Sequence, residues 1–162
     1  MTGLRTEILN LLREDARMTA ADVAKVTGAP ECEVAKEITA LEETGVIRKY
    51  TVIIDEELAE KDVVEALIEV KVSPMYKHGF DSIAEDIYQF DEVQNVYLMS
   101  GAYDLLVIIE GRSLKEVARF VSEKLSVMDK VLSTATHFIL KKYKVDGVCM
   151  KACEIRRQVV HA

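Results

Sequence analysis

Hydroxyl, basic and acidic side chains that suit contact with a nucleic acid recur between residues 19 and 49. Ammonium, guanidinium and hydroxyl groups bind backbone phosphates, and a glutamate can accept a hydrogen bond from cytosine N4. Residues 29–45, however, hold five glutamates and one lysine, and each carboxylate repels phosphates. Much of any affinity must therefore come from residues outside this segment. The candidate contact residues are Thr19, Lys25, Glu33, Lys36, Glu37, Thr39, Arg48 and Lys49.

A second group of candidate residues begins with the motif SGAYD. Gly101 allows a ligand to approach the main chain, whose N–H groups can hold a carboxylate, and Asp104 can accept a hydrogen bond from an α-ammonium group. The motif equally suits a plain hairpin turn, in which Gly101 takes a positive φ and Asp104 or Ser100 hydrogen-bonds the turn backbone. Residues of the last predicted strand can complete a ligand site across a subunit contact. The candidate effector-binding residues are Ser100, Gly101, Ala102, Tyr103, Asp104, Thr134, Thr136 and His137.

Metal binding and catalysis are not predicted. Cys149 and Cys153 are four residues apart, which on a helix would place both thiols on one face, and His161 is close by, but zinc needs four ligands. Two small apolar side chains in the tail are the simpler interpretation. His78 stands beside Gly79 in a predicted loop, and no Ser/His/Asp set, Cys/His set or glycine-rich phosphate loop stands out. We therefore expect no metal, no cofactor and no enzymatic activity.

Three helices are predicted over the first fifty residues. The first buries one face, formed by Leu4, Ile8, Leu11 and Leu12. The second is capped by Thr19, has Asp22 as its third residue and stops at Gly28. The third has Pro30 in its first turn and ends at Gly45. Its buried stripe is Val34, Ile38 and Leu41. Two helices joined by the tight TGAP turn form a helix-turn-helix.

The next segments are predicted as a wing and a linker. Residues 46–55, VIRKYTVIID, are rich in β-branched and aromatic residues and should be extended. Residues 55–62 are mostly charged, which suits a linker, with a short solvated helix as the alternative. The predicted domains are a winged helix-turn-helix over residues 1–54, a linker over 55–62, a second domain over 63–145 and a tail over 146–162.

From residue 63 the pattern is strand, helix, strand, strand, helix, strand. The strands are predicted over residues 63–73, 93–99, 104–110 and 131–143, and the helices over residues 80–90 and 113–125. Ser113 caps the second helix, with Glu116 at the capping-box position. This βαββαβ order is that of a ferredoxin-like α+β sandwich, whose two helices cover one face of an antiparallel sheet. Because LLVII is apolar on both faces, we expect a second subunit to cover the other face.

These motifs together resemble the Lrp/AsnC (feast/famine) transcription regulators over nearly the whole chain. The resemblance rests on the helix-turn-helix with LEETGVIRKYTVIID behind it, then SGAYDLLVII and the closing TATHFILKKYK. It implies a RAM-type second domain that senses an amino acid or related molecule beside the SGAYD loop, and a first domain that binds double-stranded promoter DNA. It also implies dimers that often assemble into octamers, and the tail KVDGVCMKACEIRRQVV is similar to an extension of some bacterial members. Two positions depart from the family: Glu37 stands where Arg is common, and MDKV replaces Pro-Gly-Val before the last strand.

Composition sets the class of protein. The chain has 162 residues, 49% of them apolar and 30% charged, and a net charge of −7, which disfavours a dedicated nucleic-acid binder. No apolar run could cross a membrane and the N-terminus lacks a signal-peptide pattern, so we expect a cytoplasmic protein without a membrane partner. The interpretation is a transcriptional regulator that couples a small-molecule signal to DNA binding. The alternatives are a ligand-binding or docking protein whose winged helix has lost DNA binding and, as a remote second class, an Lrp-like tetrapyrrole decarboxylase.

Overall fold

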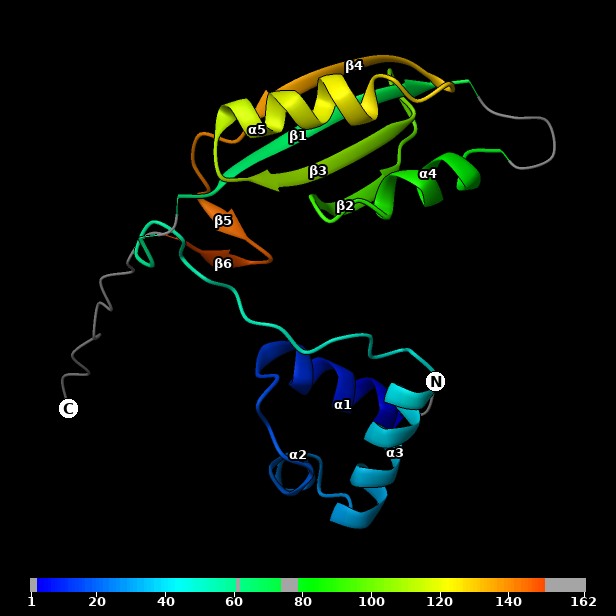
Figure 1. Cartoon of the computed structure of the whole chain (residues 1–162). Coiled ribbons are helices and arrows are strands. Elements are labelled where there is room, and N and C mark those ends of the chain that lie inside the picture. Colours follow the sequence, from blue (N-terminus) through cyan, green and yellow to red (C-terminus); the bar gives the residue numbers. More distant parts are fainter. Residues whose placement is uncertain (1–2, 61, 74–78, 151–162) are drawn as a thin grey trace. The chain divides into compact units, whose positions relative to one another are not determined.

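The computed structural model describes residues 3–60, 62–73 and 79–150 and divides into two compact units (Figure 1). Unit 1 is Met1–Ile53 and unit 2 is Ile54–Ala162. Each unit has its own core of buried apolar side chains, and each is described by itself. No helix within the described residues is long and apolar enough to cross a membrane.

Unit 1 contains three helices, α1 (Gly3–Glu14), α2 (Ala20–Thr27) and α3 (Glu31–Glu43). Thr19 caps α2 as predicted, and Asp22 makes the cap reciprocal: the Asp22 N–H donates to Thr19 Oγ1, and the Thr19 N–H donates to Asp22 Oδ2, each over 3.2 Å. Gly28 ends α2 with a φ of 71°, and Pro30 precedes α3 as its N-cap instead of lying in its first turn. The core consists of Ile8, Leu12, Val23, Val34 and Leu41.

The segment after α3, which is predicted to be extended, forms no strand. Residues 48–55 form neither helix nor strand, and Val52 and Ile54 remain 71% and 52% exposed. A strand needs a hydrogen-bonded neighbour, and no strand of the described residues pairs with this segment, so β-branched composition alone does not make the wing a strand. Residues 56–60 form a turn in which the Ala59 N–H donates to Asp55 O over 3.0 Å.

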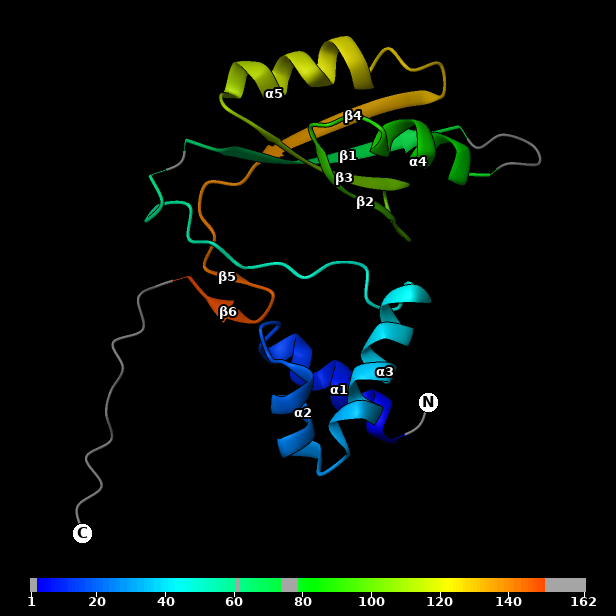
Figure 2. The same cartoon turned by 60° about the horizontal axis from the view of Figure 1, so that its bottom comes forward.

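Unit 2 is built on an antiparallel sheet with the strand order β2-β3-β1-β4. The strands are β1 (Val64–Val72), β2 (Val93–Leu98), β3 (Leu105–Gly111) and β4 (Val131–Phe138). Helix α4 (Asp81–Tyr88) follows β1, and helix α5 (Leu114–Phe120) follows β3 and continues into a π-helix, η1 (Val121–Leu125). This is the predicted βαββαβ order, and Figures 1 and 2 show α5 lying over the sheet.

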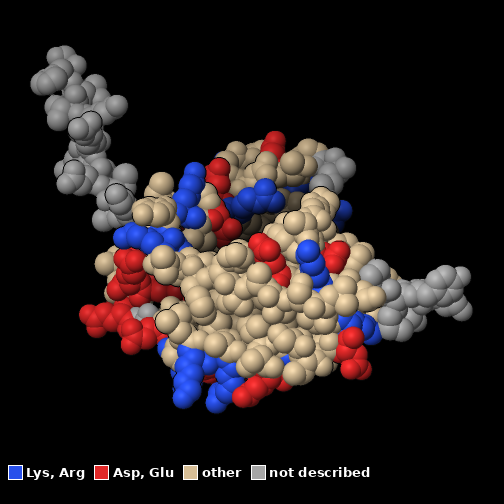
Figure 3. All heavy atoms as spheres, turned by 90° about the horizontal axis from the view of Figure 1, so that it is seen from above, with Lys and Arg blue, Asp and Glu red and all other residues tan. Residues whose placement is uncertain are grey.

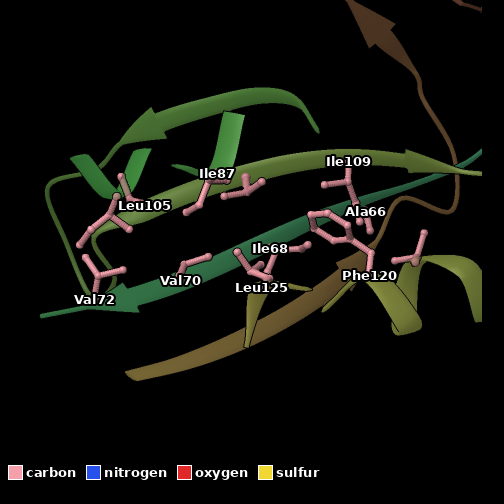
Figure 4. Packing of buried hydrophobic residues seen from close by; sticks show 12 residues of the cluster. Ala66, Ile68, Val70, Val72, Ile87, Leu105, Ile109, Phe120 and Leu125 are labelled. Atoms are coloured by element: carbon pink, nitrogen blue, oxygen red, sulfur yellow. The ribbon is translucent and has the colours of Figure 1, made fainter. Parts of the chain in front are cut away.

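Both helices of unit 2 pack on the same face of the sheet (Figure 4). Alternate residues of the two central strands point to this face, as the period of a strand requires. The buried strand residues are Ala66, Ile68, Val70 and Val72 of β1 and Leu105, Val107 and Ile109 of β3. They pack against Ile83, Ile87, Val117, Phe120 and Leu125 from the helical segments. The alternation in the sequence therefore specifies which residues form the core.

The opposite face of the sheet is left without a helix of the described residues. Cross-strand pairing puts Leu67 beside Ile108 and Glu69 beside Leu106 on this face. The three apolar side chains are half-buried, and charged or titratable groups border them. The bordering residues are Glu65, Glu69, Lys71, Glu110 and His137. This face is thus apolar at its centre and polar at its margin. The apolar run LLVII alone predicts a face that is apolar throughout.

Past β4 the chain forms a short hairpin that the sequence patterns above do not predict. Strand β5 (Lys144–Val145) pairs with β6 (Val148–Cys149) through Asp146 and Gly147, whose φ angles are 44° and 87°. An Asp-Gly pair between two strand segments is the sequence signal of a two-residue hairpin turn, and VDGV carries it.

The hairpin corrects two predictions. The closing strand expected over residues 131–143 ends at Phe138, although the Ile139 N–H still donates to Glu65 O over 2.9 Å. Cys149 lies in a strand, so the helical spacing considered for the two tail cysteines is wrong for this residue. Cys153, His161 and His78 lie outside the described residues.

Candidate functional site

Helix α3 has an exposed face opposite its buried stripe. Val34 and Leu41 are fully buried, and at about 100° per residue Lys36 and Thr39 fall on the other side. Glu33, Lys36 and Thr39 are exposed, and the Thr39 hydroxyl donates to Ala35 O over 3.0 Å. Three of the predicted contact residues therefore share one accessible helix surface, with a single ammonium group among them.

Glu37 does not lie on that surface. Its Oε1 is 2.8 Å from Nε of Arg5 in α1, and the two side chains are 31% and 29% exposed. Position 37 flanks the buried stripe, three residues after Val34 and four before Leu41, which turns its side chain towards α1. The structure thus places Glu37 against α1, whereas the candidate DNA contact at this position requires a side chain on the exposed face of α3.

Thr19 and Lys25 of the α2 region are both engaged by Asp22. The Thr19 hydroxyl donates to Asp22 Oδ2 over 2.6 Å, and Lys25 Nζ lies 3.3 Å from Asp22 Oδ1. The hydrogen bonds from Thr19, with a smaller contribution from Lys25, lower the pKa of the Asp22 carboxyl. The Lys25 side chain is nevertheless 76% exposed, so its ammonium group remains accessible to a phosphate.

Arg48 and Lys49 lie just beyond α3, in the segment expected to form the wing. Both are exposed. The Arg48 guanidinium packs over Gly45, whose φ of 70° reverses the chain after α3 and which leaves room for that guanidinium. Two residues further on, the Tyr50 hydroxyl donates to Glu42 Oε1 over 2.9 Å, which holds the segment beside the helix. The basic pair is therefore presented close to the C-terminal end of α3.

The loop of residues 99–104 joins β2 to β3 and is fixed to β1 by Asp104. The Asp104 N–H donates to Val70 O over 3.1 Å, its Oδ2 accepts from the Val72 N–H over 2.9 Å, and its carbonyl accepts from the Met99 N–H over 2.8 Å. Ser100, Gly101 and Ala102 are exposed, while Tyr103 is half-buried.

Gly101 differs from its prediction. Its φ is not positive, and a Cβ built on it would meet no atom within 4 Å. The turn therefore does not require glycine for its backbone conformation. What the glycine provides is open space beside the main chain.

The three candidates on β4 do not share one face of the sheet. Thr134 and Thr136 pair with Val70 and Ile68, so they point to the helix-covered side, whereas His137 pairs with Leu67 on the opposite side. Thr134 Oγ1 lies 3.2 Å from Ser126 Oγ, and His137 Nε2 lies 3.3 Å from Glu69 Oε1. Within one chain the structure thus keeps His137 apart from the two threonines. The period of two along a strand carries this information in the sequence itself.

Two ion pairs in the structure were not predicted from the sequence. Arg5 lies in no recognisable motif. The sequence indicates its pairing only in that Arg5 flanks the buried stripe of α1 and Glu37, of opposite charge, flanks that of α3. Lys142, which contacts Glu65 and lies 3.7 Å from Glu56 Oε2, joins segments far apart in the chain and has no local signal. Among the residues that the structure describes, no group of three or more His, Cys, Asp or Glu could hold a metal ion.

Comparison with known proteins assigns both units. Residues 65–148 match the family model of the Lrp/AsnC ligand binding domain, and residues 1–48 match that of a winged helix-turn-helix DNA-binding domain. The chain is 48% identical over 161 residues to the HTH-type transcriptional regulator YugG of Bacillus subtilis (strain 168), covering 99% of this chain and 97% of the relative. It is 31% identical over 137 residues to the HTH-type transcriptional regulator LrpA of Pyrococcus horikoshii, covering 85% and 94%.

Solved structures show the same fold. The AsnC structure of E. coli covers 90% of this chain and 95% of its own with a TM-score of 0.70 at 21% identity. A transcriptional regulator of Neisseria meningitidis, NMB0573, solved as a complex with L-Met, covers 90% and 93% with a TM-score of 0.72 at 20% identity. The fold, the two matched domains and a relative 48% identical over almost the whole chain agree. The protein therefore belongs to the Lrp/AsnC family of DNA-binding transcriptional regulators that carry a small-molecule ligand-binding domain.

Proposed function

We propose that unit 2 binds an amino acid at the loop of residues 99–104 and that this binding changes the affinity of unit 1 for double-stranded DNA. The observation that carries the proposal is the state of the loop: Asp104 fixes it to β1, while Ser100, Gly101 and Ala102 stay exposed. Backbone N–H groups held in place can bind a carboxylate without being ordered first. The N. meningitidis regulator of the same fold was solved with L-Met, which supports an amino acid as the effector class.

The Asp104 carboxylate supplies the partner for the ammonium group. Its Oδ2 accepts the Val72 N–H, and Oδ1 is the oxygen proposed to accept from the ligand. Thr134 lies in the same cross-strand row as the start of β3, because Val70 pairs with Leu105 on one side and with Thr134 on the other. Thr134 is therefore the β4 residue best placed to line the site, with Thr136 one row further in. His137, on the other face, would contribute from a second subunit.

We also propose that the protein works as a homodimer or a larger assembly such as an octamer. No helix of the described residues covers the sheet face that has Leu67, Leu106 and Ile108 at its centre. Edge strand β4 contains no Lys, Arg, Asp or Glu, the residues that commonly protect an edge, and its Leu132 is 68% exposed. Figure 3 views the α5 and β4 side from above and shows a continuous area without charged side chains, bordered by both signs of charge. A second copy of the chain would cover such surfaces.

DNA contact is proposed for the accessible basic groups. Lys36 on α3, Lys25 on α2 and the pair Arg48 and Lys49 are exposed and can reach phosphates. Because Glu33 shares the α3 surface with Lys36, one unit 1 would bind weakly, and several copies in one assembly would supply the affinity. We place this activity in the cytoplasm and assign no catalytic role, since the relatives compared are transcriptional regulators.

The test is fluorescence anisotropy of a labelled duplex taken from upstream of the protein's own coding sequence, with and without each amino acid. At least one amino acid should shift the binding curve of the wild type. Gly101→Val should remove this shift, because a Cβ at this position meets no atom within 4 Å and the valine side chain would fill the open space beside the loop. Gln94→Val is the matched control, since Gln94 is exposed at the other end of β2.

Three results would contradict the proposal. An unchanged response of Gly101→Val would place the amino acid elsewhere, and failure of every amino acid to change either DNA affinity or thermal stability would remove the effector. Absence of DNA binding by the wild type even at low salt, with amino-acid binding intact, would favour the docking alternative. The exposed carboxylates of Glu31, Glu33 and Glu43 on α3 are the observation that supports this alternative.

A further inference from the structure

A cavity of about 350 Å³ lies in unit 2 where the chain enters and leaves the sheet. Its walls come from the turn after unit 1, the start of β1 with the residue before it, the segment after β4 and the residue after β6. Ile54, Val63, Ile139 and Met150 provide apolar surface. The volume lies within the range of cavities that hold small molecules, about 300–1,000 Å³. The cavity therefore has the size and the mixed lining of a ligand site.

The charged groups of the lining are predominantly negative. Four carboxylates, from Asp55, Glu56, Glu57 and Glu65, face two ammonium groups, from Lys141 and Lys142. Lys142 Nζ contacts the Glu65 carboxylate and lies 3.7 Å from Glu56 Oε2, so its charge is already matched by two carboxylates. An anionic ligand would have to displace one of them. The cavity therefore favours a positive charge.

Burial strengthens this preference. The Glu65 side chain is 16% exposed and that of Lys142 33% exposed, and charges removed from water are screened less by solvent and salt. Burial alone lowers the pKa of Lys142, but the hydrogen bond to Glu65 and the charges of Glu65, Glu56 and Glu110 outweigh it and raise that pKa. A group held in its cationic form by surrounding carboxylates reports a negative potential at this place.

We propose that this cavity binds a small organic cation with an apolar body, of the size of a primary alkylamine. Lys142 faces the Oε2 atoms of Glu56 and Glu65, so the ligand's ammonium group would pair with the second oxygen, Oε1, of each carboxylate. Its alkyl group would lie on Ile54, Ile139 and Met150. An amino acid fits less well, because its carboxylate would meet the same glutamates. The ligand would touch both the turn that leads into unit 2 and the segment that leaves β4, and so would fasten the two together.

The cavity is separate from the amino-acid site proposed above. Glu65 lies near the start of β1 and Val72, which binds Asp104, lies at its end, seven residues later. At about 3.3 Å per residue the two places are roughly 23 Å apart along the strand. The inference therefore does not rest on the proposed function.

The experiment is isothermal titration calorimetry of the full chain with three probes that share one isobutyl group. Isoamylamine is cationic, L-leucine is zwitterionic and 4-methylpentanoate is anionic. We expect saturable binding of isoamylamine and none of 4-methylpentanoate. Glu65→Gln and Glu56→Gln should each weaken isoamylamine binding about tenfold, the loss expected for one charged hydrogen-bond partner. Glu85→Gln, the same change at an exposed position of α4, should bind as the wild type does.

The proposal is overturned if isoamylamine does not bind, if 4-methylpentanoate binds equally well, or if both cavity variants bind isoamylamine like Glu85→Gln. Should Glu65→Gln fail to fold by circular dichroism, Glu56→Gln decides, because Glu56 lies in the turn outside the sheet. Binding of L-leucine that survives Glu56→Gln and is lost in Gly101→Val belongs to the loop site. The two proposals can therefore fail independently.

Discussion

The ion pair between Arg5 and Glu37 gives the sharpest prediction for unit 1. Its atoms are 2.8 Å apart, and its side chains are only 29% and 31% exposed. Exposed pairs contribute about 0.2–1 kcal/mol, whereas breaking a buried pair costs about 3–5 kcal/mol. This pair lies between these limits, so we expect Glu37→Gln to lower the free energy of unfolding of unit 1 by about 1–2 kcal/mol.

Glu37→Arg should be more harmful, although Arg is common at this position in the family. Two guanidinium groups would then face each other between α1 and α3, at a cost of about 2–3 kcal/mol. Exchanging the charges, with Arg5→Glu and Glu37→Arg together, should recover at least half of the loss. Glu33→Arg is the matched control, since it makes the same charge change at an exposed position of α3 and should alter stability by less than about 0.5 kcal/mol.

Urea denaturation followed by circular dichroism measures these differences in stability. A salt titration of DNA binding measures the effect of the same variants on DNA affinity. Glu33→Arg, not Glu37→Arg, should raise DNA affinity and steepen the slope of log K against log salt by about one to two, because each phosphate contact contributes about −0.9. The reasoning is refuted if Glu37→Arg unfolds at the same urea concentration as Glu33→Arg, or if the charge exchange restores nothing.

Three further predictions concern local structure. Lys124 donates to Glu92 over 2.5 Å and lowers the pKa of that carboxyl below its unfolded value. The stability from this pair should therefore be present at neutral pH and be lost as pH falls through the folded pKa. The urea midpoint should fall less steeply between pH 7 and pH 3 in Glu92→Gln than in the wild type. Thr19→Ala should cost about 1 kcal/mol by removing the cap of α2, and a cost no greater than that of an exposed serine-to-alanine change elsewhere would contradict the cap's role. Gly147→Ala should destabilise the β5–β6 hairpin by about 1 kcal/mol because its φ is 87°, which amide hydrogen exchange of the Met150 N–H can detect; unchanged exchange would argue against the strained turn.

Local patterns in the sequence were sufficient for most of the fold. The Thr19 and Asp22 cap, the Gly28 stop and the alternation in β1 and β3 each depend on neighbours within a few residues. Ser113 likewise accepts from the Glu116 N–H as predicted, but the Glu116 carboxylate takes the Arg112 N–H over 2.7 Å, one residue earlier than a capping box requires. Such a shift depends on side-chain rotamers that a pattern does not contain.

Features that join distant segments could not be predicted in the same way. Whether Glu37 meets solvent or Arg5 depends on how α3 crosses α1, and whether residues 48–55 form a strand depends on a hydrogen-bonding neighbour. The candidate ligand site was predictable in part: a period of two separates His137 from Thr134 and Thr136, and VDGV signals a hairpin. The cavity around Lys142 was not, because its walls come from four separate segments.

The contact between Glu56 and Lys142 bears on how this protein could be recombined with its relatives. Unit 2 begins at Ile54, and residues of the turn at 55–58 line the cavity together with residues 139–142. A chimera that receives a foreign DNA-binding module should therefore be joined before Ile54, so that the turn stays with its own Lys142. A junction at residue 62, where the charged segment ends, would pair a foreign turn with this lysine. Of its two carboxylate partners, only Glu65 would then remain. The junction of a chimera should thus be chosen from the ion pairs that it would break as well as from the composition of the linker.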